Sequence, residues 1–576
     1  MRIYSLGLLC LYAAGMARAG TESAEKAAIG YGGPERKISM SIWSDKYTYR
    51  AGERLTLKWT VKTNGDLYPY TMFAYRQNNQ NGKKFYLPSG TEAVPEMQPA
   101  PLRDAAKAEL AAVTVPDEPG MHTLVVQLRD YTGTRVLKSV YMKIGVVTEQ
   151  VTVSAPITTN TTWVNTKSYL VSGVVMVKNG ATLTIEPGTI VFGAAGSQPP
   201  SALLVTRDGK LSAEGTKSRP IVMTSAQIFG ERKRGDWGGL VMLGKAPVNV
   251  GANTSGNTNA AGTFFIEGLN ATDDGLYGGT DANHSCGSLA YVRVEYAGSI
   301  LSPNNELNSF TFGGCGKGTS AHHLQAIYGL DDSFEWFGGT MDAKYLVGGL
   351  GADDYVDFQL GWVGRIQYGI FYQSPDSRGN RGVEGDNSEF NNAATPISNP
   401  TMYNLTFIGS GQPGFDEAAS PGIFLRRGAR ATMNNMVVSN FFSGAVEFTD
   451  ANTQAQLDAG NIAMNGFLAW NNNIGATGAN TVAGQIPNAP TQAFALGTRA
   501  AGKAANFVIS DPMLLRPFDY SDPDFRGRFG SPIFRAGWVS APDDGFFDQS
   551  ATFIGGIGDE DWTEEWTSFV VDTEIL

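Results

Sequence analysis

The chain has 576 residues, 70 of them glycine, with only 17% charged residues and a formal net charge of −11. This length can hold several domains, or one long repeat array with an added module. The acidic balance argues against a phosphate backbone as a partner, so we expect no nucleic-acid binding. Frequent glycine suits a β-rich chain with many turns.

The first residues have the three parts of a secretory signal peptide. Arg2 supplies the charged start, residues 5–15 the apolar run, and residues 17–19 (ARA) a small-x-small cleavage site. The run is too short to span a bilayer, and no later segment is apolar enough to do so. We therefore expect residues 1–19 to be removed and residues 20–36 to be a linker. The mature chain would be exported, without a transmembrane segment, to the periplasm, the cell surface or the medium.

Alternating strands are predicted over residues 37–147. Leu55, Leu57, Trp59 and Val61 alternate with polar residues, which is the pattern of a half-buried antiparallel strand. Turn signals follow at short intervals. This segment resembles the immunoglobulin-like β-sandwich modules of secreted bacterial proteins.

Repeats begin after the sandwich. Residues 179–189 (NGATLTIEPGT) have a shorter echo 29 residues later in residues 208–216 (DGKLSAEGT), and each copy follows an apolar strand. Units of this period bury their apolar faces by stacking on neighbours. They resemble the opening coils of the pectin-lyase-like superfamily, and residues 236–249 (DWGGLVMLGKAPVN) and 331–339 (DDSFEWFGG) resemble a secreted bacterial subfamily of it. The resemblance implies a right-handed parallel β-helix over residues 148–510.

Further coils are indicated by spacing alone. Asn404, Asn435 and Gly466 each open a similar apolar segment, at intervals of 31 residues. The two asparagines should stack, and their side-chain amides could hydrogen-bond along the axis.

The last part of the chain, residues 511–576, is predicted to form a C-terminal coil and cap. Residues 511–512 (DP), 524–526 (DFR) and 531–532 (SP) resemble the ending of many β-helix proteins. Trp562 and Trp566 are spaced so that both could lie on one face of a short helix and dock on the last coil.

Two cysteines remain once the signal peptide is removed. Cys286 and Cys315 are 29 residues apart, close to one turn of the solenoid. In an exported protein we expect them to form a disulfide between adjacent coils.

The segments most suggestive of chemistry are residues 329–338 (GLDDSFEWFG) and 351–361 (GADDYVDFQLG), which repeat at a spacing of 22 residues. Equivalent positions on adjacent coils lie about 4.8 Å apart, and like charges at that distance repel by roughly 3 kcal/mol at an effective dielectric of about 20. Three pairs would form, Asp331 with Asp353, Asp332 with Asp354 and Glu335 with Asp357, and Glu384 and Asp386 could add a third tier.

Something should relieve this repulsion: a cation such as Ca²⁺, a nearby arginine such as Arg365 or Arg381, or a shared proton. Three interpretations stay open. The aspartates could form solvated turns at coil corners, or the metal-site candidates could bind Ca²⁺, or paired carboxylates could cleave a glycosidic bond. The candidate catalytic residues are Asp331, Asp332, Asp353 and Asp354. The candidate metal ligands are Asp331, Asp332, Glu335, Asp353, Asp354, Asp357, Glu384 and Asp386.

The paired aspartates of residues 331–332 superficially match those of polygalacturonases, but the accompanying motifs are missing. His322 and His323 are not followed by glycine. No P-loop or dinucleotide motif occurs, so we expect no organic cofactor. The sequence favours an all-β, exported, non-enzymatic protein that binds a polysaccharide, an ion or a cell-surface protein along the solenoid. The alternative is a polysaccharide lyase or glycoside hydrolase.

Overall fold

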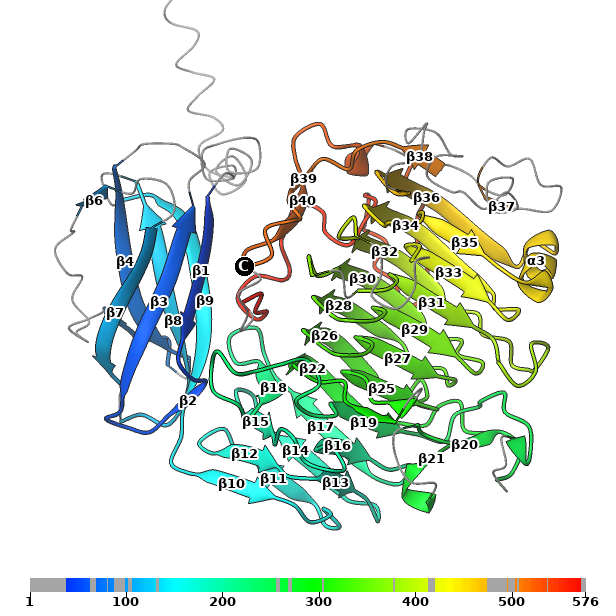
Figure 1. The fold of residues 1–576 in the computed structure, drawn as a ribbon, viewed down its shortest axis with the longest axis horizontal. Coiled ribbons are helices and arrows are strands. Elements are labelled where there is room, and N and C mark those ends of the chain that lie inside the picture. Colours follow the sequence, from blue (N-terminus) through cyan, green and yellow to red (C-terminus); the bar gives the residue numbers. More distant parts are fainter. Residues whose placement is uncertain are drawn as a thin grey trace, which may run out of the picture.

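The computed structural model describes residues 38–570, apart from fifteen internal gaps. These gaps are residues 63–68, 80, 87–98, 102–105, 116, 131–133, 255–258, 268–271, 303–304, 377–378, 413–419, 474–494, 496–502, 505–506 and 536. A β-sandwich lies beside a long stack of parallel strands, and the C-terminal segment runs back between them (Figure 1). The predicted signal peptide and linker lie outside the described residues.

The sandwich consists of two sheets around one core. The first has the order β1-β3-β7 and the second β2-β9-β8-β4-β5, with β6 on β4. Inward residues of both sheets, such as Leu57 and Leu124, form its core. Its strands are β1 (Ser39–Ser44), β2 (Thr48–Tyr49), β3 (Arg54–Lys62), β4 (Pro69–Asn78), β5 (Lys84–Tyr86), β6 (Pro99–Pro101), β7 (Ala106–Thr114), β8 (Gly120–Arg129) and β9 (Val136–Val146). The predicted sandwich is confirmed, whereas its kinship with immunoglobulin-like modules stays a prediction.

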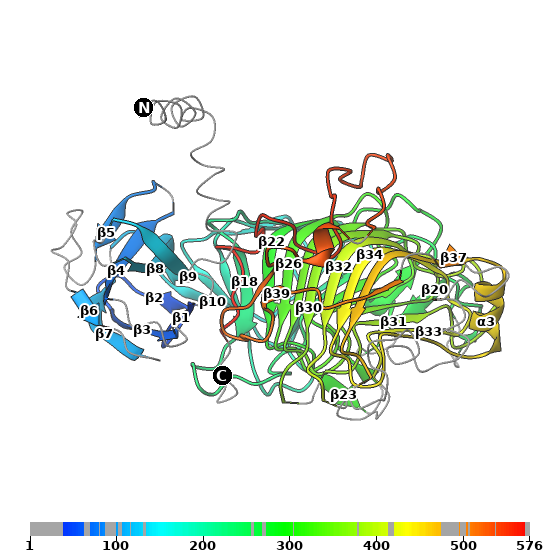
Figure 2. The ribbon, with the colours of Figure 1, turned by 90° about the horizontal axis from the view of Figure 1, so that it is seen from above.

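The strands from β10 to β38 build a parallel β-helix, as predicted (Figure 2). Its first parallel sheet contains β10 (Gln150–Val153), β12 (Ser168–Val171), β15 (Ile190–Gly193), β18 (Ile221–Ser225), β22 (Gly287–Glu295), β26 (Ser320–Ile327), β28 (Ala343–Gly349), β30 (Arg365–Tyr372), β32 (Thr401–Ile408), β34 (Ala431–Ser439), β36 (Ile462–Trp470) and β37 (Lys503–Ala504), with β11 (Thr161–Trp163), β14 (Thr182–Ile185), β17 (Lys210–Glu214) and β38 (Phe507–Ile509) paired alongside.

The second parallel sheet carries the predicted site. It contains β13 (Val174–Val177), β16 (Ala202–Val205), β19 (Leu240–Leu243), β25 (Phe310–Gly313), β27 (Phe334–Phe337), β29 (Val356–Gln359), β31 (Val383–Asp386), β33 (Ile423–Arg426) and β35 (Val446–Phe448). Smaller elements are β20 (Thr263–Phe265), η3 (Asp273–Gly275), β21 (Leu276–Gly278), β23 (Ile300–Ser302), β24 (Asn305–Glu306), α3 (Ala451–Asp458), β39 (Leu514–Arg516), β40 (Asp524–Gly527) and η4 (Pro532–Phe534). No helix among the described residues is long and apolar enough to cross a membrane.

The core lies between the two sheets and is rich in stacked aromatic rings. Phe310 stacks on Phe334 at 5.1 Å between ring centroids, and Trp336 stacks on Trp362 at 4.7 Å. Successive side chains of a strand face opposite ways, so the inward position of Phe334 and Trp336 turns Glu335 outward. The inward aromatic rows thus fix which residues face outward.

Each long strand of the first sheet from β22 to β36 is interrupted by a residue with left-handed φ. The positions, one per coil, are Tyr291, His323, Tyr345, Tyr368, Asn404, Asn435 and Gly466. The rings stack, with centroids 4.2 Å apart for Tyr291 and His323 and 4.3 Å apart for His323 and Tyr345. Asparagine and glycine accept this conformation readily, which accounts for their recurrence at this corner.

The predicted hydrogen bonding between Asn404 and Asn435 is wrong, although the register of 31 residues is confirmed. Asn404 Nδ2 donates to the carbonyl of Phe553 at 2.8 Å, and Asn435 Nδ2 donates to the carbonyl of Val539 at 2.9 Å. The left-handed corner faces the C-terminal segment, which supplies backbone partners to both amides.

The prediction that Trp562 and Trp566 dock on the last coil is also wrong. They lie in a turn and pack on the side of middle coils, where Trp566 is 5.7 Å from the His323 ring and Trp562 is 5.3 Å from the Tyr345 ring. The aromatic column of the first sheet is the surface that these indoles cover. The C-terminal segment therefore braces the side of the β-helix.

The predicted disulfide is confirmed. Cys286 and Cys315 are joined, and both sulfur atoms are buried in the core of the β-helix. The bridge connects the residue before β22 to the turn after β25, and so ties the end of the long excursion between β19 and β22 to the stack.

Candidate functional site

Outward carboxylates form a column on the second parallel sheet. Glu335 on β27 pairs in register with Asp357 on β29, and Asp357 pairs with Glu384 on β31. Glu335 is 3% exposed and Glu384 8% exposed, while Asp357 is half-buried. The predicted spacing of 22 residues between the first two coils is therefore confirmed.

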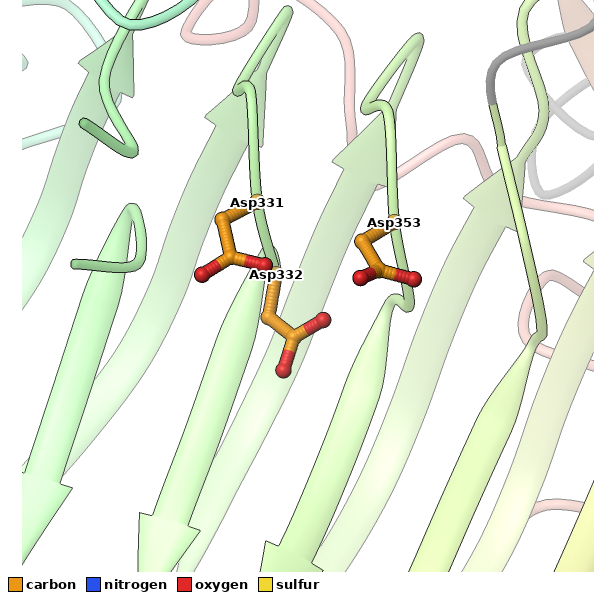
Figure 3. A group of neighbouring side chains, drawn as sticks. All are labelled: Asp331, Asp332 and Asp353. Atoms are coloured by element: carbon orange, nitrogen blue, oxygen red, sulfur yellow. The ribbon is translucent and has the colours of Figure 1, made fainter. Parts of the chain in front are cut away.

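The paired aspartates lie in the turns that lead into β27 and β29. Asp331 and Asp353 take equivalent places on neighbouring coils, and the Asp332 carboxylate points between them (Figure 3). Asp331 and Asp353 are half-buried, whereas Asp332 and Asp354 are 6% and 2% exposed. The first aspartate of each pair is thus the one that solvent or a ligand can reach.

Together these residues make three overlapping groups of carboxylates. In each group, one oxygen from every member lies within 4.8 Å of the others. The groups are Asp331, Asp332 and Asp353; Asp332, Glu335 and Asp357; and Asp354, Asp357 and Glu384. Because neighbouring groups share Asp332 or Asp357, we treat them as one acidic cluster.

Part of this cluster is structural. Asn308 Oδ1 accepts a hydrogen bond from the Asp332 backbone N–H at 3.1 Å, and Asp332 Oδ1 accepts one from the Asp354 N–H at 2.9 Å. Asp354 Oδ1 in turn accepts from the Arg381 N–H at 2.5 Å. This corner ladder joins four successive coils, so Asp332 and Asp354 each have one oxygen committed to backbone. The interpretation as solvated turns does not fit these two residues.

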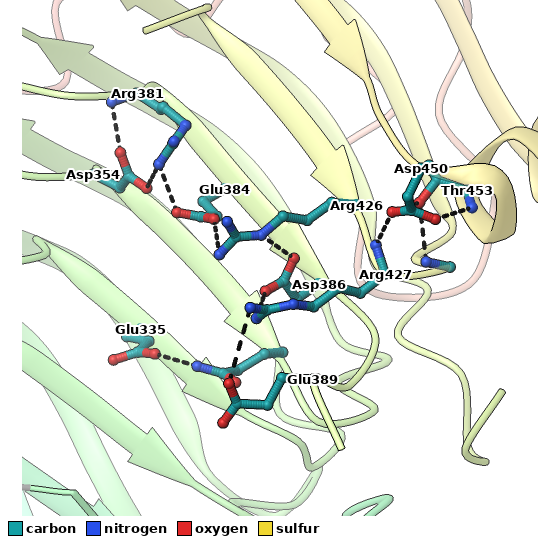
Figure 4. Close-up of polar contacts among 12 residues, drawn as sticks. Glu335, Asp354, Arg381, Glu384, Asp386, Glu389, Arg426, Arg427, Asp450 and Thr453 are labelled. Carbon is teal, nitrogen blue, oxygen red and sulfur yellow. Dashed lines mark hydrogen bonds and ion pairs between the residues drawn. The ribbon is translucent and has the colours of Figure 1, made fainter. Parts of the chain in front are cut away.

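One end of the cluster is neutralised by arginines (Figure 4). Arg381 Nη1 lies 2.7 Å from Glu384 and 3.5 Å from Asp354. Arg426 pairs with both Glu384 and Asp386, the latter at 2.8 Å. Burial strengthens such pairs because little water screens them. Arg381, one of the two predicted arginine partners, therefore serves the cluster.

Arg365, the other predicted arginine partner, lies elsewhere. It pairs with Asp342 at 2.5 Å and Asp544 at 2.6 Å. It begins β30 in the first parallel sheet, whereas the acidic cluster lies on the second. The expectation that Arg365 relieves the aspartate repulsion is wrong.

The opposite end of the cluster contains carboxylates without cations. Among the described residues, no lysine or arginine pairs with Asp331, Asp332, Glu335 or Asp357. Glu335 is instead held by neutral amides, since Asn308 Nδ2 and Gln359 Nε2 both donate to it, the latter at 3.0 Å. We call these four residues the uncompensated end.

The electrostatics reflect this imbalance. Burial, reinforced by neighbouring carboxylates, holds the pKa of Asp331, Asp332, Glu335 and Asp357 well above the usual range. At the other end burial raises the pKa of Asp354 to about 6 and that of Glu384 to about 8, and Arg381 opposes both shifts. The uncompensated end therefore needs protons or a bound cation to relieve the charge.

Several residues of the site could not be predicted from the repeat. Glu267 reaches Glu335 from the excursion between β19 and β22, and burial raises the pKa of Glu267 to about 8. Thr311 is the register partner of Glu335 on β25. Asn308 lies 24 residues from Asp332, so a search at a fixed period of 22 residues misses it, whereas Arg381, 27 residues after Asp354, was predicted only from its proximity in sequence.

Comparison with known proteins agrees with this architecture. A family model described as a pectate-lyase-like beta helix domain matches residues 155–508. No curated protein matches the chain. The family match covers most of the chain, including every coil that contributes to the acidic cluster. The protein therefore belongs to the family with a pectate-lyase-like β-helix domain.

Proposed function

We propose that this is an exported, non-enzymatic binding protein whose β-helix holds a calcium ion at the uncompensated end of the acidic cluster. The observation that carries the proposal is the convergence of Asp331, Asp332, Glu335 and Asp357 without a lysine or arginine partner among the described residues. Four buried or half-buried carboxylates in mutual contact are costly unless a cation or protons offset the charge.

The donor chemistry fits calcium. Ca²⁺ takes about six to eight oxygen ligands from carboxylates, carbonyls, hydroxyls and water. Thr311 Oγ1 and Asp357 Oδ1 are buried without a hydrogen-bond partner among the residues that the structure describes, and their residues flank Glu335 in the same outward column. Phe310 and Phe312 pack into the core, which turns Thr311 to the same face. Two oxygens without partners beside a carboxylate are what a hard cation would use.

The ion would serve binding in two ways. It would fasten the coils of β25, β27 and β29 to one another by ligands from each. It would also leave Asp331 and Asp353, which are half-buried, at the edge of the site, where a polysaccharide or a cell-surface protein could complete the coordination. The disulfide between Cys286 and Cys315 supports export, because such bonds persist in oxidising compartments.

The test is calorimetric titration of CaCl₂ into the EDTA-treated and dialysed full chain. The double variant Glu335→Gln, Asp357→Asn keeps the shapes of both side chains and should abolish binding. Asp543→Asn removes an exposed carboxylate next to Asp544, which pairs with Arg365 of the first sheet, and should bind calcium as the wild type does. Absence of heat with the wild type, or equal binding by the double variant, would refute the calcium site.

Acid–base catalysis is the second candidate, favoured by one observation. Asp331 and Asp353 are paired, half-buried, and in the group whose oxygens lie within 4.8 Å of one another. That separation is shorter than the roughly 6.5–9.5 Å of inverting glycosidases, so a hydrolase would have to use the retaining mechanism. A screen of acidic and neutral polysaccharides for new reducing ends or unsaturated products decides the matter. Product release that Asp353→Asn abolishes would favour the enzyme over the binding protein.

A further inference from the structure

A cavity of about 390 Å³ lies between the sandwich, the β-helix and the C-terminal segment. Its walls come from β1 and β9, from the β-helix near Arg232 and Arg293, and from residues 521–526 and 561–570. In Figure 1 the C-terminal segment enters the space between the two units. Volumes of about 300–1,000 Å³ at domain junctions are typical of small-molecule sites. This cavity is separate from the acidic cluster, and none of the cluster's residues lines it.

The walls of this interdomain cavity are fixed by buried hydrogen bonds. Tyr47 of the sandwich donates its hydroxyl proton to Glu295 of the β-helix at 2.9 Å, within a cluster that includes Arg293. The Met40 N–H of β1 donates to Asp522 of the C-terminal segment at 3.1 Å. Gln325 of the β-helix donates to the Ser568 carbonyl of the C-terminal segment at 2.8 Å, so direct bonds join each pair of walls and the cavity is a preformed part of the fold.

Lys143 is the unusual charge of this cavity. It lies on β9 on the face opposite the core residues Val140 and Ile144, and is only 3% exposed. Its Nζ donates to the Thr123 hydroxyl at 2.9 Å, and no carboxylate pairs with it among the described residues. Burial lowers the pKa of Lys143 to about 8, so it still carries its proton at pH 7. A buried ammonium that is bonded to a neutral hydroxyl leaves donors for an anionic partner.

Three other cations in the cavity wall already have counterions. Lys138 lies 2.8 Å from Asp522, Arg293 lies 2.5 Å from Glu295, and Arg526 lies 2.7 Å from Asp524. These carboxylates are committed and do not approach Lys143. Lys143 therefore differs from these three cations, which line the same cavity and form ion pairs.

Glu565 faces the cavity from the C-terminal wall. It is the largest acidic influence on Lys143, yet the two form no ion pair, and Glu565 pairs with no lysine or arginine elsewhere in the described chain. The cavity therefore has a cation, Lys143, on the sandwich wall and an anion, Glu565, on the C-terminal wall, and neither has an ionic partner among the described residues. A ligand that carries both a negative and a positive group would match them. Tyr141 lies on the same face of β9 two residues before Lys143 and offers an aromatic surface between the walls.

We propose that the interdomain cavity binds a small zwitterion of the amino-acid class, with its carboxylate on Lys143, its ammonium on Glu565 and its side chain against Tyr141. The carboxylate would accept the remaining N–H donors of the lysine, and the ammonium would donate to the glutamate. An apolar or aromatic ligand side chain would fit the tyrosine ring better than a second charge. A molecule that carries only one of the two charges would leave either Lys143 or Glu565 without an ionic partner.

The experiment is titration of the full chain with L-phenylalanine, L-leucine and glycine, followed by saturation-transfer NMR. Acetate and ethylamine each present one of the two charged groups. We expect L-phenylalanine to bind and both single-charge probes to fail. Lys143→Met and Glu565→Gln should each weaken binding about tenfold or more, the usual loss for one charged hydrogen bond.

Lys317→Met, an exposed lysine outside the cavity, is the matched control and should bind as the wild type does. Lys143→Arg keeps the charge and should retain more affinity than Lys143→Met. If Lys143→Met does not fold, Glu565→Gln still tests the proposal, because Glu565 lies outside the sandwich. The proposal is overturned if none of the amino acids binds, if acetate binds as well as they do, or if Glu565→Gln leaves their affinity unchanged.

Discussion

Replacing His323 by tyrosine should remove a large part of the acid sensitivity of this protein. The imidazole stacks between Tyr291 and Tyr345 at 4.2 and 4.3 Å and is covered by Trp566. Burial, with smaller effects from His322 and Lys217, lowers the pKa of His323 to about 3. Tyr291 and Tyr345 adopt the same left-handed φ on the adjacent coils, so the backbone at residue 323 accepts tyrosine.

The direction and the magnitude of this change in stability follow from proton linkage. In the unfolded chain the imidazole titrates near pH 6.5, whereas in the folded chain it stays neutral down to about pH 3. Between those values the unfolded state binds more protons, so stability is lost as the pH falls through 6.5. At pH 4.5, two units below the unfolded pKa, the loss amounts to about 3 kcal/mol. A tyrosine at this position carries no such penalty.

The assay is urea unfolding in EDTA at pH 7.5 and pH 4.5, followed by tryptophan fluorescence, which Trp562 and Trp566 report at this site. The wild type should lose about 3 kcal/mol more than His323→Tyr between the two pH values. Tyr345→Phe changes the same stack without a titrating group in that range and should keep the wild-type difference. Equal pH dependence in the wild type and His323→Tyr would refute the assigned burial of the imidazole.

Three other outcomes are expected. EDTA should lower the melting temperature, since calcium at a hundred times its Kd stabilises the folded state by about 3 kcal/mol, and an unchanged melt would contradict the site. Trp336→Ala should cost about 3–5 kcal/mol in urea unfolding because the indole is fully buried on Trp362, and Trp336→Phe should cost less. Asn435→Ala loses two hydrogen bonds to Val539 and strains a left-handed φ, so proteolysis should release the C-terminal segment sooner than in Asn435→Gly.

The register of the acidic cluster could be predicted because a repeat in the sequence becomes a stack in space. Residues 22 positions apart pair directly where the turn length is constant, as with Glu335 and Asp357. At the next coil the turn is longer and the period of 22 residues no longer holds, although Glu384 still stacks on Asp357 as the predicted third tier. Glu384 pairs with Asp357 at a separation of 27, and Arg381 takes the place of the second aspartate. A fixed period cannot account for variation in turn length, and this is why Asn308, which lies 24 residues before Asp332, was not predicted.

Contacts between distant segments were predicted least well. The spacing of Trp562 and Trp566 correctly indicates two indoles that act together, but not the surface that they cover. That surface is created by the left-handed corners of the first sheet, which turn His323 and Tyr345 outward. In the same way, Glu267 belongs to the site because its excursion folds over the second sheet. The alternation of apolar and polar residues predicts which face of the sheet a side chain occupies. The length of the segments between coils determines which distant residues contact it.

Stacking identical coils places like residues in contact, which is favourable for aromatic rings and unfavourable for carboxylates. The chain resolves the conflict differently at the two ends of the acidic cluster. At β31 and β33 the arginines Arg381 and Arg426 supply the opposite charge from within the fold. At β27 neutral amides hold Glu335, and within the described part of the chain one oxygen each of Thr311 on β25 and Asp357 on β29 has no hydrogen-bond partner. Among the described residues, arginines offset the charge at one end, and the bound cation proposed above would offset it at the other, where protons are the alternative.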